Sequence, residues 1–348
     1  MELILASAGS YPQSGPGAEL QVLVEARRAV ARGEKTAADL SDAENFMVRR
    51  AIEEQVSAGL ELVTDGLTRR VDPISHLAGK LEGVRLGAER SLPGGGTFRV
   101  PVLAKRPERR APLLADEYRF ACNALGAMGT PRGKAGKLSV KAVLTGPYTL
   151  ARYSEADDAA MASLESRAEA FAKALAAEVA ALAEGGAEHI QVDELAAPEG
   201  TPGWELLGRS LQPLAAACEA ARRKGGRVVL TVSLQFPGVA EHYDSLASLP
   251  ADVLGLDLAT DSALYARVTS SGSPRPLHLG IVNHRNPDME NTRDLARKLE
   301  ALLPKLPAGR GYLGPAGGLD ALPRERAREK LALVARVREI VADRPVPL

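Results

Sequence analysis

Cysteine is scarce in this sequence, and its scarcity argues against two classes of protein. Only Cys122 and Cys218 occur among the 348 residues, each in an alanine-rich stretch that predicts a helix. Small secreted domains held by disulfides carry many more cysteines, and structural zinc sites need closely spaced pairs. We therefore expect both cysteines to be reduced and packed among apolar neighbours.

A net charge and a long apolar segment are also missing. Lys plus Arg and Asp plus Glu both number 44, so no overall field attracts nucleic acid or an anionic membrane. The first residues, MELILAS, contain an early acid and too short an apolar run for a signal peptide. Charges interrupt the longest apolar stretches well before the ~18 residues that a membrane span needs. We expect a cytoplasmic protein with neither nucleic-acid nor membrane partners.

Short runs rich in leucine and β-branched residues alternate with amphipathic segments along the whole chain, and this alternation predicts parallel βαβ units. Eight such units favour one α/β domain over residues 1–348, closed as a (β/α)8 TIM barrel, with an open doubly wound sheet as the alternative. The predicted strands are Leu3–Ser7, Leu60–Asp65, Ser139–Thr145, Glu188–Asp193, Arg227–Ser233, Asp252–Asp257, Leu277–Val282 and Gly311–Gly314.

The segments between these strands repeat apolar residues at spacings of three and four, which predicts helices. The clearest are Asp42–Ala58, Asp158–Glu184, Leu206–Lys224, Asn291–Leu303 and Pro323–Ala342. Ser41, Asp157 and Asn291 are the expected N-caps of three of them. Residues 83–131 interrupt the repeat and predict a hairpin and a helix inserted after the second strand.

Polar residues at the carboxyl ends of barrel strands are the functional candidates, because active sites of this fold lie at that face. The fourth strand ends in Gln191, Asp193 and Glu194, and burying two acids is costly unless a cation pairs with them. Strand alternation directs Gln191 and Asp193 to one side and Glu194 to the other. The acids either hold a substrate ammonium group or move a proton, or they cap a helix or pair with a neighbouring loop.

The histidines divide by the same criterion. His284 follows the strand that ends at Val282 and faces the expected pocket mouth. His189 and His278 enter strands at the amino ends and are expected to be structural, and His242 is expected at the surface.

Three other strand ends carry candidates. Asp65 opens a loop in which Arg69 and Arg70 suit a substrate carboxylate or structural ion pairs. Ser10 follows the first strand, where its hydroxyl and nearby backbone N–H groups can hold an anion. Tyr153, after the third strand, offers an aromatic face to a planar ligand or simply packs in the wall.

Seven segments in order resemble the catalytic C-terminal barrel of cobalamin-independent methionine synthase. They are SAGSYPQ, VTDGLTRRVD, VLTGPYTL, HIQVDELAAPEG, ADVLGLDLATD, LGIVNHRNP and YLGPAGGL, and the likeness covers nearly the whole chain. The resemblance implies the barrel fold. It also implies methyl transfer from 5-methyltetrahydrofolate to the sulfur of homocysteine.

The resemblance also implies roles for single residues. Ser10 matches the serine that holds the amino-acid carboxylate, and Asp193 matches the acid that holds its ammonium group. Residues that also match the family are Arg70, Asp72 and Glu199. A second amino-acid-binding acid of the family is replaced by Leu67.

The aromatic and proton-donating positions of the family are also altered here. The folate-stacking tryptophan falls near Tyr153. The proton-donating histidine aligns with Arg285, and His284 beside it can take that role.

The zinc ligands of the family are the clearest departure. The positions of its His, Cys, Glu and Cys ligands read Thr231, Ser233, Asp257 and Gly317 in this sequence. Zinc serves there to convert a thiol with a pKa near ~8.5 into a thiolate. One carboxylate and two hydroxyls are poor ligands for Zn²⁺, so we predict no tight zinc site of the family type.

Three functions follow from these patterns. The first is a methionine-synthase-like methyltransferase with a changed acceptor or without zinc activation. In it Asp193 and Ser10 hold an amino-acid-like substrate, Tyr153 and the loop arginines contact a folate-like donor, and His284 moves a proton. The second is a non-catalytic ligand-binding paralogue that acts with an unknown protein partner. The third is metal-free decarboxylase or lyase chemistry of the uroporphyrinogen decarboxylase type.

Overall fold

The computed structural model describes residues 2–92, 95–129 and 137–342, and eight parallel strands form its main sheet. In hydrogen-bonded order they are β1 (Glu2–Leu5), β11 (Arg310–Pro315), β10 (Leu277–Val282), β9 (Val253–Asp257), β8 (Val229–Leu234), β7 (His189–Glu194), β5 (Ser139–Thr145) and β2 (Leu62–Val63). A parallel bridge between Ala6 and Leu62 joins the two ends of this order. The predicted (β/α)8 barrel is therefore confirmed.

The helices alternate with these strands along the chain. They are α1 (Val22–Ala31), α2 (Ala37–Ser57), α3 (Ser75–Ala78), α4 (Ala115–Ala127), α5 (Pro147–Arg152), α6 (Leu164–Glu184), α7 (Gly200–Arg223), α8 (Tyr243–Ala247), α9 (Ser262–Ser271), α10 (Thr292–Leu302) and α11 (Arg324–Ala342). No helix of the described part of the chain is long and apolar enough to cross a membrane.

Two of the three predicted N-caps are wrong. Helix α2 begins one turn earlier than predicted, at a capping box in which the Thr36 hydroxyl and the Asp39 carboxylate accept each other's backbone N–H. Helix α6 is capped by Ser163, because a short 3₁₀ turn precedes it. Asn291 does cap α10, where its side chain accepts from two backbone N–H groups.

The predicted insertion after the second strand is present. Strands β3 (Glu82–Ser91) and β4 (Thr97–Glu108) form an antiparallel hairpin, and β6 (Glu155–Ala156) adds to β4 in parallel. Helix α4 follows the hairpin. Residues 93–94 and 130–131 of the predicted excursion lie outside the described residues.

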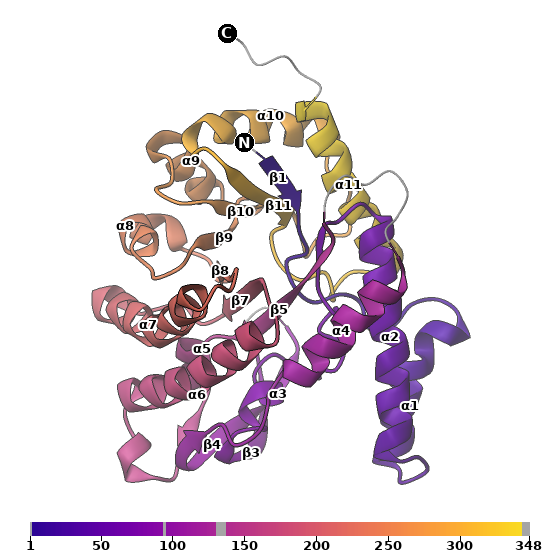
Figure 1. Cartoon of the computed structure of the whole chain (residues 1–348), viewed down its shortest axis with the longest axis vertical. Coiled ribbons are helices and arrows are strands. Elements are labelled where there is room, and N and C mark those ends of the chain that lie inside the picture. Colours follow the sequence, from indigo (N-terminus) through magenta and orange to yellow (C-terminus); the bar gives the residue numbers. More distant parts are fainter. Residues whose placement is uncertain (1, 93–94, 130–136, 343–348) are drawn as a thin grey trace. The chain divides into compact units, whose positions relative to one another are not determined.

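Two compact units make up the fold. Unit 1 comprises Met1–Arg69, Phe120–Val140 and Gly255–Leu348, and unit 2 comprises Arg70–Arg119 and Lys141–Leu254. Within unit 1, α1 packs on α2, and within unit 2, α6 lies beside α7 (Figure 1). That residues 1–348 form a single domain stays a prediction.

Each unit buries its strands and the inner faces of its helices. Fully buried side chains include Leu5, Ile52, Val63, Leu279 and Val334 in unit 1, and Leu144, Phe171, Ile190, Leu207 and Val232 in unit 2. Strands covered on both faces read as near-continuous apolar runs, as β10 does. A polar side chain inside such a strand therefore needs a partner, and these exceptions locate the candidate sites. Cys218 is buried as expected, whereas Cys122 is half-buried.

Candidate functional site

A chain of buried polar side chains runs along the interior of β5 and β7 in unit 2. The Lys141 ammonium donates to Gln191 Oε1 at 2.6 Å, and Gln191 Nε2 donates to Asp193 Oδ1 at 2.6 Å. Alternate residues of a strand share a face, so Gln191 and Asp193 lie together at the carboxyl end of β7 as predicted. Arg70 is also buried and donates to the backbone carbonyl of Val143 on β5.

Burial and neighbouring charges have opposite effects on the pKa values of Asp193 and Lys141. Burial raises the pKa of Asp193 to about 6, although the hydrogen bond from Gln191 and the charges of Lys141 and Arg70 lower it. Burial likewise lowers the pKa of Lys141 to about 8, opposed by the charge of Asp193. The charges of Lys141 and Asp193 thus each favour the ionised form of the other, and Asp193 lies buried at the strand end.

Glu194 points the other way and already has partners. It is fully buried and accepts from the backbone N–H groups of Tyr148 (3.2 Å) and Thr149 (2.8 Å), and from the Thr149 hydroxyl. Burial raises its pKa to about 7. The geometry supports the helix-capping alternative over the substrate-binding role that we predicted for Glu194, because its oxygens serve the start of α5.

A second cluster lies in unit 1, after β10 and β11. The His284 ring rests against the backbone of Gly317, where an added Cβ would come within 2.8 Å of the ring. His284 Nε2 accepts from Arg285 Nε at 3.1 Å, so the proton of the neutral ring is on Nδ1. Nδ1 is buried and has no hydrogen-bond partner among the described residues. Burial lowers the pKa of His284, while Asp257 and Asp320 raise it.

The surroundings of Ser10 oppose the role expected for it. Its hydroxyl donates to the carboxylate of Asp320, three residues after Gly317 in the loop that follows β11. A substrate carboxylate held at Ser10 would therefore face another carboxylate. Sequence reasoning did not consider Asp320, although it follows the Gly-Gly-Leu of a strand-end loop.

The loop after β2 uses its polar groups internally. The Asp65 carboxylate accepts from the backbone N–H of Leu67 at 2.9 Å, in a turn where Leu67 has a φ of 51°. A residue other than glycine rarely adopts this left-handed conformation, so the hydrogen bond that Leu67 N–H donates to Asp65 helps to hold it. Arg69 pairs with Glu44 at 3.2 Å and donates to Asn45 at 2.6 Å.

Tyr153 and Glu199 lie in unit 2. The half-buried Tyr153 ring meets Phe98 edge to face, with centroids 5.3 Å apart. Glu199 precedes α7 and pairs with Arg152 of α5, with 76 % of its side chain exposed. Both remain accessible enough to contact a ligand.

The four positions that the resemblance matches to the family's zinc ligands carry two hydroxyls, one carboxylate and one glycine. Thr231 and Ser233 lie on β8, in register with Gln191 and Asp193, and Asp257 ends β9. Their hydroxyl and carboxylate oxygens, with no side chain at Gly317, lack the sulfur and imidazole that Zn²⁺ prefers. In the part of the chain that the structure describes, no three His, Cys, Asp or Glu residues are grouped to hold a metal ion.

The predicted site residues thus divide between two groups. Unit 2 brings together Asp193, Arg70, Glu194, Thr231 and Ser233 around β7, and unit 1 brings together His284, Arg285, Asp257 and, with Asp320, Ser10. Sequence reasoning missed Lys141, although a lysine within the apolar strand SVKAVLT is itself a signal.

Two histidines serve packing. His278 is buried and donates to the carbonyl of Pro315 at 3.2 Å. His242, which we expected at the surface, is half-buried with its ring 5.3 Å from that of Trp204. His242 is only partly exposed because its ring contacts Trp204 of α7.

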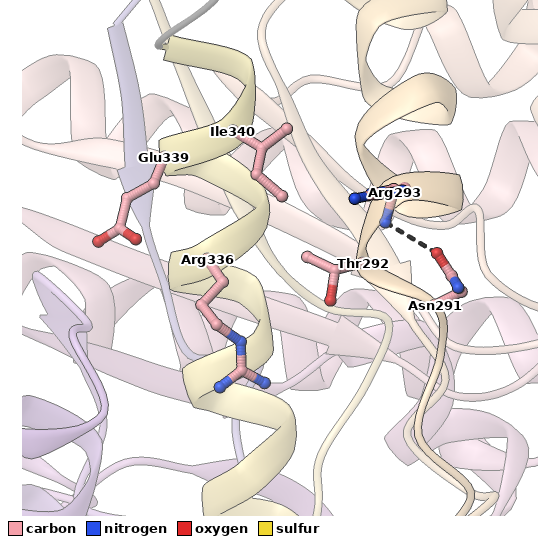
Figure 2. Close-up of a pocket in the computed structure, with 6 residues that line it drawn as sticks. All are labelled: Asn291, Thr292, Arg293, Arg336, Glu339 and Ile340. Carbon is pink, nitrogen blue, oxygen red and sulfur yellow. Dashed lines mark hydrogen bonds between the residues drawn. The ribbon is translucent and has the colours of Figure 1, made fainter.

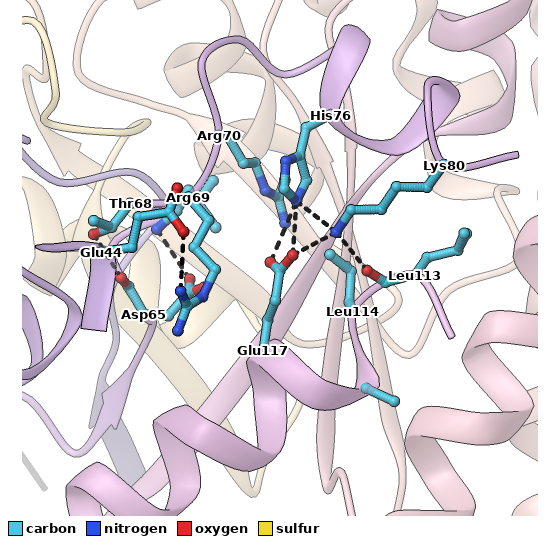
Figure 3. Close-up of polar contacts among 12 residues, drawn as sticks. Glu44, Asp65, Thr68, Arg69, Arg70, His76, Lys80, Leu113, Leu114 and Glu117 are labelled. Atoms are coloured by element: carbon cyan, nitrogen blue, oxygen red, sulfur yellow. Dashed lines mark hydrogen bonds and ion pairs between the residues drawn. The ribbon is translucent and has the colours of Figure 1, made fainter. Parts of the chain in front are cut away.

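A charged cluster joins α3 to α4 in the insertion of unit 2. Glu117 accepts from His76 at 3.0 Å and pairs with Lys80, which also donates to the carbonyl of Leu113 at 2.7 Å (Figure 3). Burial raises the pKa of Glu117, but the hydrogen bonds and charges of His76 and Lys80 outweigh it and hold the pKa at about 2. These mutual contacts give the cluster a structural role.

A cavity of about 560 Å³ opens between the start of α10 and the end of α11 in unit 1 (Figure 2). It is lined by Asn291, Thr292, Arg293, Arg336, Glu339 and Ile340. None of the predicted site residues lines it, and Asn291 is occupied as the cap of α10.

Comparison with known proteins agrees with this fold. The family model described as the catalytic domain of cobalamin-independent synthase matches residues 3–339. Methionine synthase of Saccharolobus solfataricus is 24% identical, with 96% of this chain and 93% of that protein covered. The enzyme of Sulfurisphaera tokodaii is 26% identical, with 96% and 91% covered.

The solved structures agree with the fold as well. The B12-independent methionine synthase from Shewanella sp. W3-18-1, solved with selenomethionine, superimposes with a TM-score of 0.72 at 18% identity, over 98% of each chain. A second structure, titled a putative vitamin-B12 independent methionine synthase from Listeria monocytogenes, has a TM-score of 0.68 at 18% identity and covers 98% of this chain and 99% of that one. The chain therefore belongs to the cobalamin-independent synthase family defined by this catalytic domain.

Proposed function

We propose that the protein is a methyltransferase of the methionine synthase type that binds an amino-acid-like acceptor and works without a zinc-bound thiolate. The observation that carries the proposal is the buried Asp193 side chain at the end of β7, which accepts from Gln191 and whose ionised form the charges of Lys141 and Arg70 favour. A buried carboxylate of this kind recognises an ammonium group by a charge-assisted hydrogen bond. Family membership supplies the reaction class.

The donor is a folate-like molecule in this proposal. Tyr153 offers a half-buried ring for a pterin, and the nearby ion pair of Arg152 with Glu199 can open to meet a polar edge of the ligand. Stacking on an aromatic ring suits a planar heterocycle. These residues belong to unit 2, as does Asp193.

Methyl transfer breaks the bond from the donor nitrogen to carbon and forms a bond from sulfur or another acceptor atom to the same carbon. The acceptor loses a proton and the donor nitrogen gains one. We assign the second step to His284 in its imidazolium form, which burial disfavours and the charges of Asp257 and Asp320 favour. Arg285 orients the ring by donating to Nε2, so it acts through His284.

Loss of zinc activation is part of the proposal, because the donor set at positions 231, 233, 257 and 317 does not fit the metal. A thiol acceptor would then react slowly at neutral pH, since the thiol is the weaker nucleophile. The same observation favours a second candidate, a paralogue that binds the amino acid without turnover. The decarboxylase alternative has less support, because Arg69 is already neutralised by Glu44.

One experiment separates these candidates. Binding of L-methionine, L-homocysteine and 5-methyltetrahydrofolate is measured by calorimetry, and transfer of labelled methyl is followed in the same preparation. Asp193→Asn should weaken amino-acid binding about 10-fold or more by removing a charged hydrogen bond. Asp116→Asn, which alters an exposed pair with Arg119, is the matched control.

The outcomes differ clearly. Turnover that Asp193→Asn abolishes supports the methyltransferase. Binding without turnover supports the paralogue. Failure to bind both an amino acid and a folate would refute the proposed function.

A further inference from the structure

Lys141 is a buried cation for which the proposed reaction has no direct use. It sits on β5 with 3 % of its surface exposed, and its ammonium donates to the side chain of Gln191. An ammonium group in an apolar strand is costly unless its protons are accepted and a negative charge lies near. The acidic group that Lys141 reaches through its hydrogen-bond partner Gln191 is Asp193.

The direction of the hydrogen bonds is fixed by Lys141. An ammonium group can only donate, so the Gln191 carbonyl oxygen must face it. The amide NH₂ of Gln191 is thereby turned to Asp193, whose carboxylate accepts. The flipped amide would place NH₂ against the ammonium and the carbonyl against the carboxylate, and both contacts would be repulsive.

The groups around Asp193 reinforce this arrangement. Arg70 and Lys141 both favour its ionised form, and Gln235 donates a second hydrogen bond to it. Burial raises the pKa of Glu194 on the opposite face, and the charge of Asp193 adds to this effect. Lys141 therefore fixes which group of Gln191 faces Asp193, and its charge favours the ionised carboxylate.

We propose that Lys141 is a positioning residue that acts through Gln191 to orient the Asp193 carboxylate for the ammonium group of the ligand. The ligand part of this inference rests on the proposed function. The orientation of the carboxylate does not, because Lys141, Gln191 and Asp193 are joined in the protein alone.

The test uses the full chain and two independent readouts. The first is the titration midpoint of the Asp193 carboxyl, followed by carbon-13 NMR of Asp-labelled protein and assigned with Asp193→Asn. The second is the Kd of L-methionine by calorimetry, compared with that of its deaminated analogue. Lys141→Met removes the positive charge. Gln191→Met removes the amide that links Lys141 to Asp193 but keeps both charged residues. Lys141→Arg retains a cation that can donate a hydrogen bond.

Lys141→Met should raise the Asp193 midpoint by about one pH unit, since a nearby cation shifts a carboxyl by about that much or more. It should weaken L-methionine on the order of 10-fold and leave the deaminated analogue unchanged. Gln191→Met should weaken the binding of L-methionine with a smaller change in the Asp193 midpoint. Lys141→Arg should retain most of the affinity for L-methionine. Lys80 belongs to the same unit but is not hydrogen-bonded to Lys141, Gln191 or Asp193, so Lys80→Met should change neither readout.

An unchanged Asp193 midpoint in folded Lys141→Met would overturn the inference. If that variant does not fold, unchanged L-methionine affinity in Gln191→Met would overturn it. A shifted midpoint in a protein that binds no amino acid would leave the carboxylate positioning standing and refute the proposed function. Equal losses for L-methionine and its deaminated analogue would also overturn the inference, because a merely structural effect of Lys141 does not depend on the ammonium group.

Discussion

Gly146→Ala tests how closely the Glu194 carboxylate packs against the backbone at the start of α5. A Cβ at position 146 would lie 2.2 Å from the Glu194 carboxyl carbon and one of its oxygens, far inside van der Waals contact. Gly146 has φ −71° and ψ 155°, which alanine adopts without strain. Any loss of stability therefore comes from displacing the carboxylate rather than from the backbone.

The magnitude follows from what Glu194 would lose. Its carboxylate accepts two backbone N–H groups and the Thr149 hydroxyl while fully buried, so displacement leaves several buried polar groups unsatisfied. Each such loss costs roughly 1–3 kcal/mol, and partial relaxation brings the expected total to about 3 kcal/mol. For a chain of this length that lowers the Tm by about 4 °C.

Gly208→Ala is the matched control for this variant. Gly208 lies inside α7, and an added Cβ would meet nothing nearer than Leu249 at 3.9 Å. The substitution should stabilise the protein by about 0.5–1 kcal/mol through helix propensity. Urea unfolding followed by circular dichroism compares the two variants. If Gly146→Ala proves as harmless as Gly208→Ala, the close fit of Glu194 against the start of α5 is refuted.

Two further predictions concern charge. Burial raises the pKa of Glu194 to about 7 from an ordinary value of 4.5, so the folded state binds the carboxyl proton more tightly than the unfolded state. The free energy of unfolding therefore falls by up to about 3 kcal/mol as the pH rises from 4.5 to about 7. Glu194→Gln should thus destabilise less at pH 7.5 than at pH 5 in urea titrations, and a constant difference would contradict the assignment. Asp320→Asn removes the charged acceptor of the Ser10 hydroxyl and should change the free energy of unfolding by less than about 1 kcal/mol in urea titrations, because the pair is exposed, with Asp42→Asn as the control. A larger loss would mean that this hydrogen bond holds the loop after β11.

The sequence predicted the barrel well because its signals are local. Strands β5 (SVKAVLT) and β10 (LHLGIV) are short, mostly apolar and buried segments, and both begin and end where predicted. The start of α2 was misplaced because Thr36 and Ser41 are both acceptable caps, and only the reciprocal hydrogen bonds with Asp39 distinguish them. Local propensity alone cannot choose between two such residues.

The amino-acid sequence alone determined that β7 ends in acids of opposite orientation, since alternation along a strand needs no tertiary information. Which acid is occupied was decided only in the folded chain, where α5 brings its N–H groups to Glu194 and β5 brings Lys141 toward Asp193 through Gln191. The sequence also showed a glycine at position 317, but only the fold placed the His284 ring against the Gly317 backbone. The physical reason is that hydrogen bonds and steric fits depend on contacts between residues far apart in the chain, whereas strand and helix patterns repeat within a few residues.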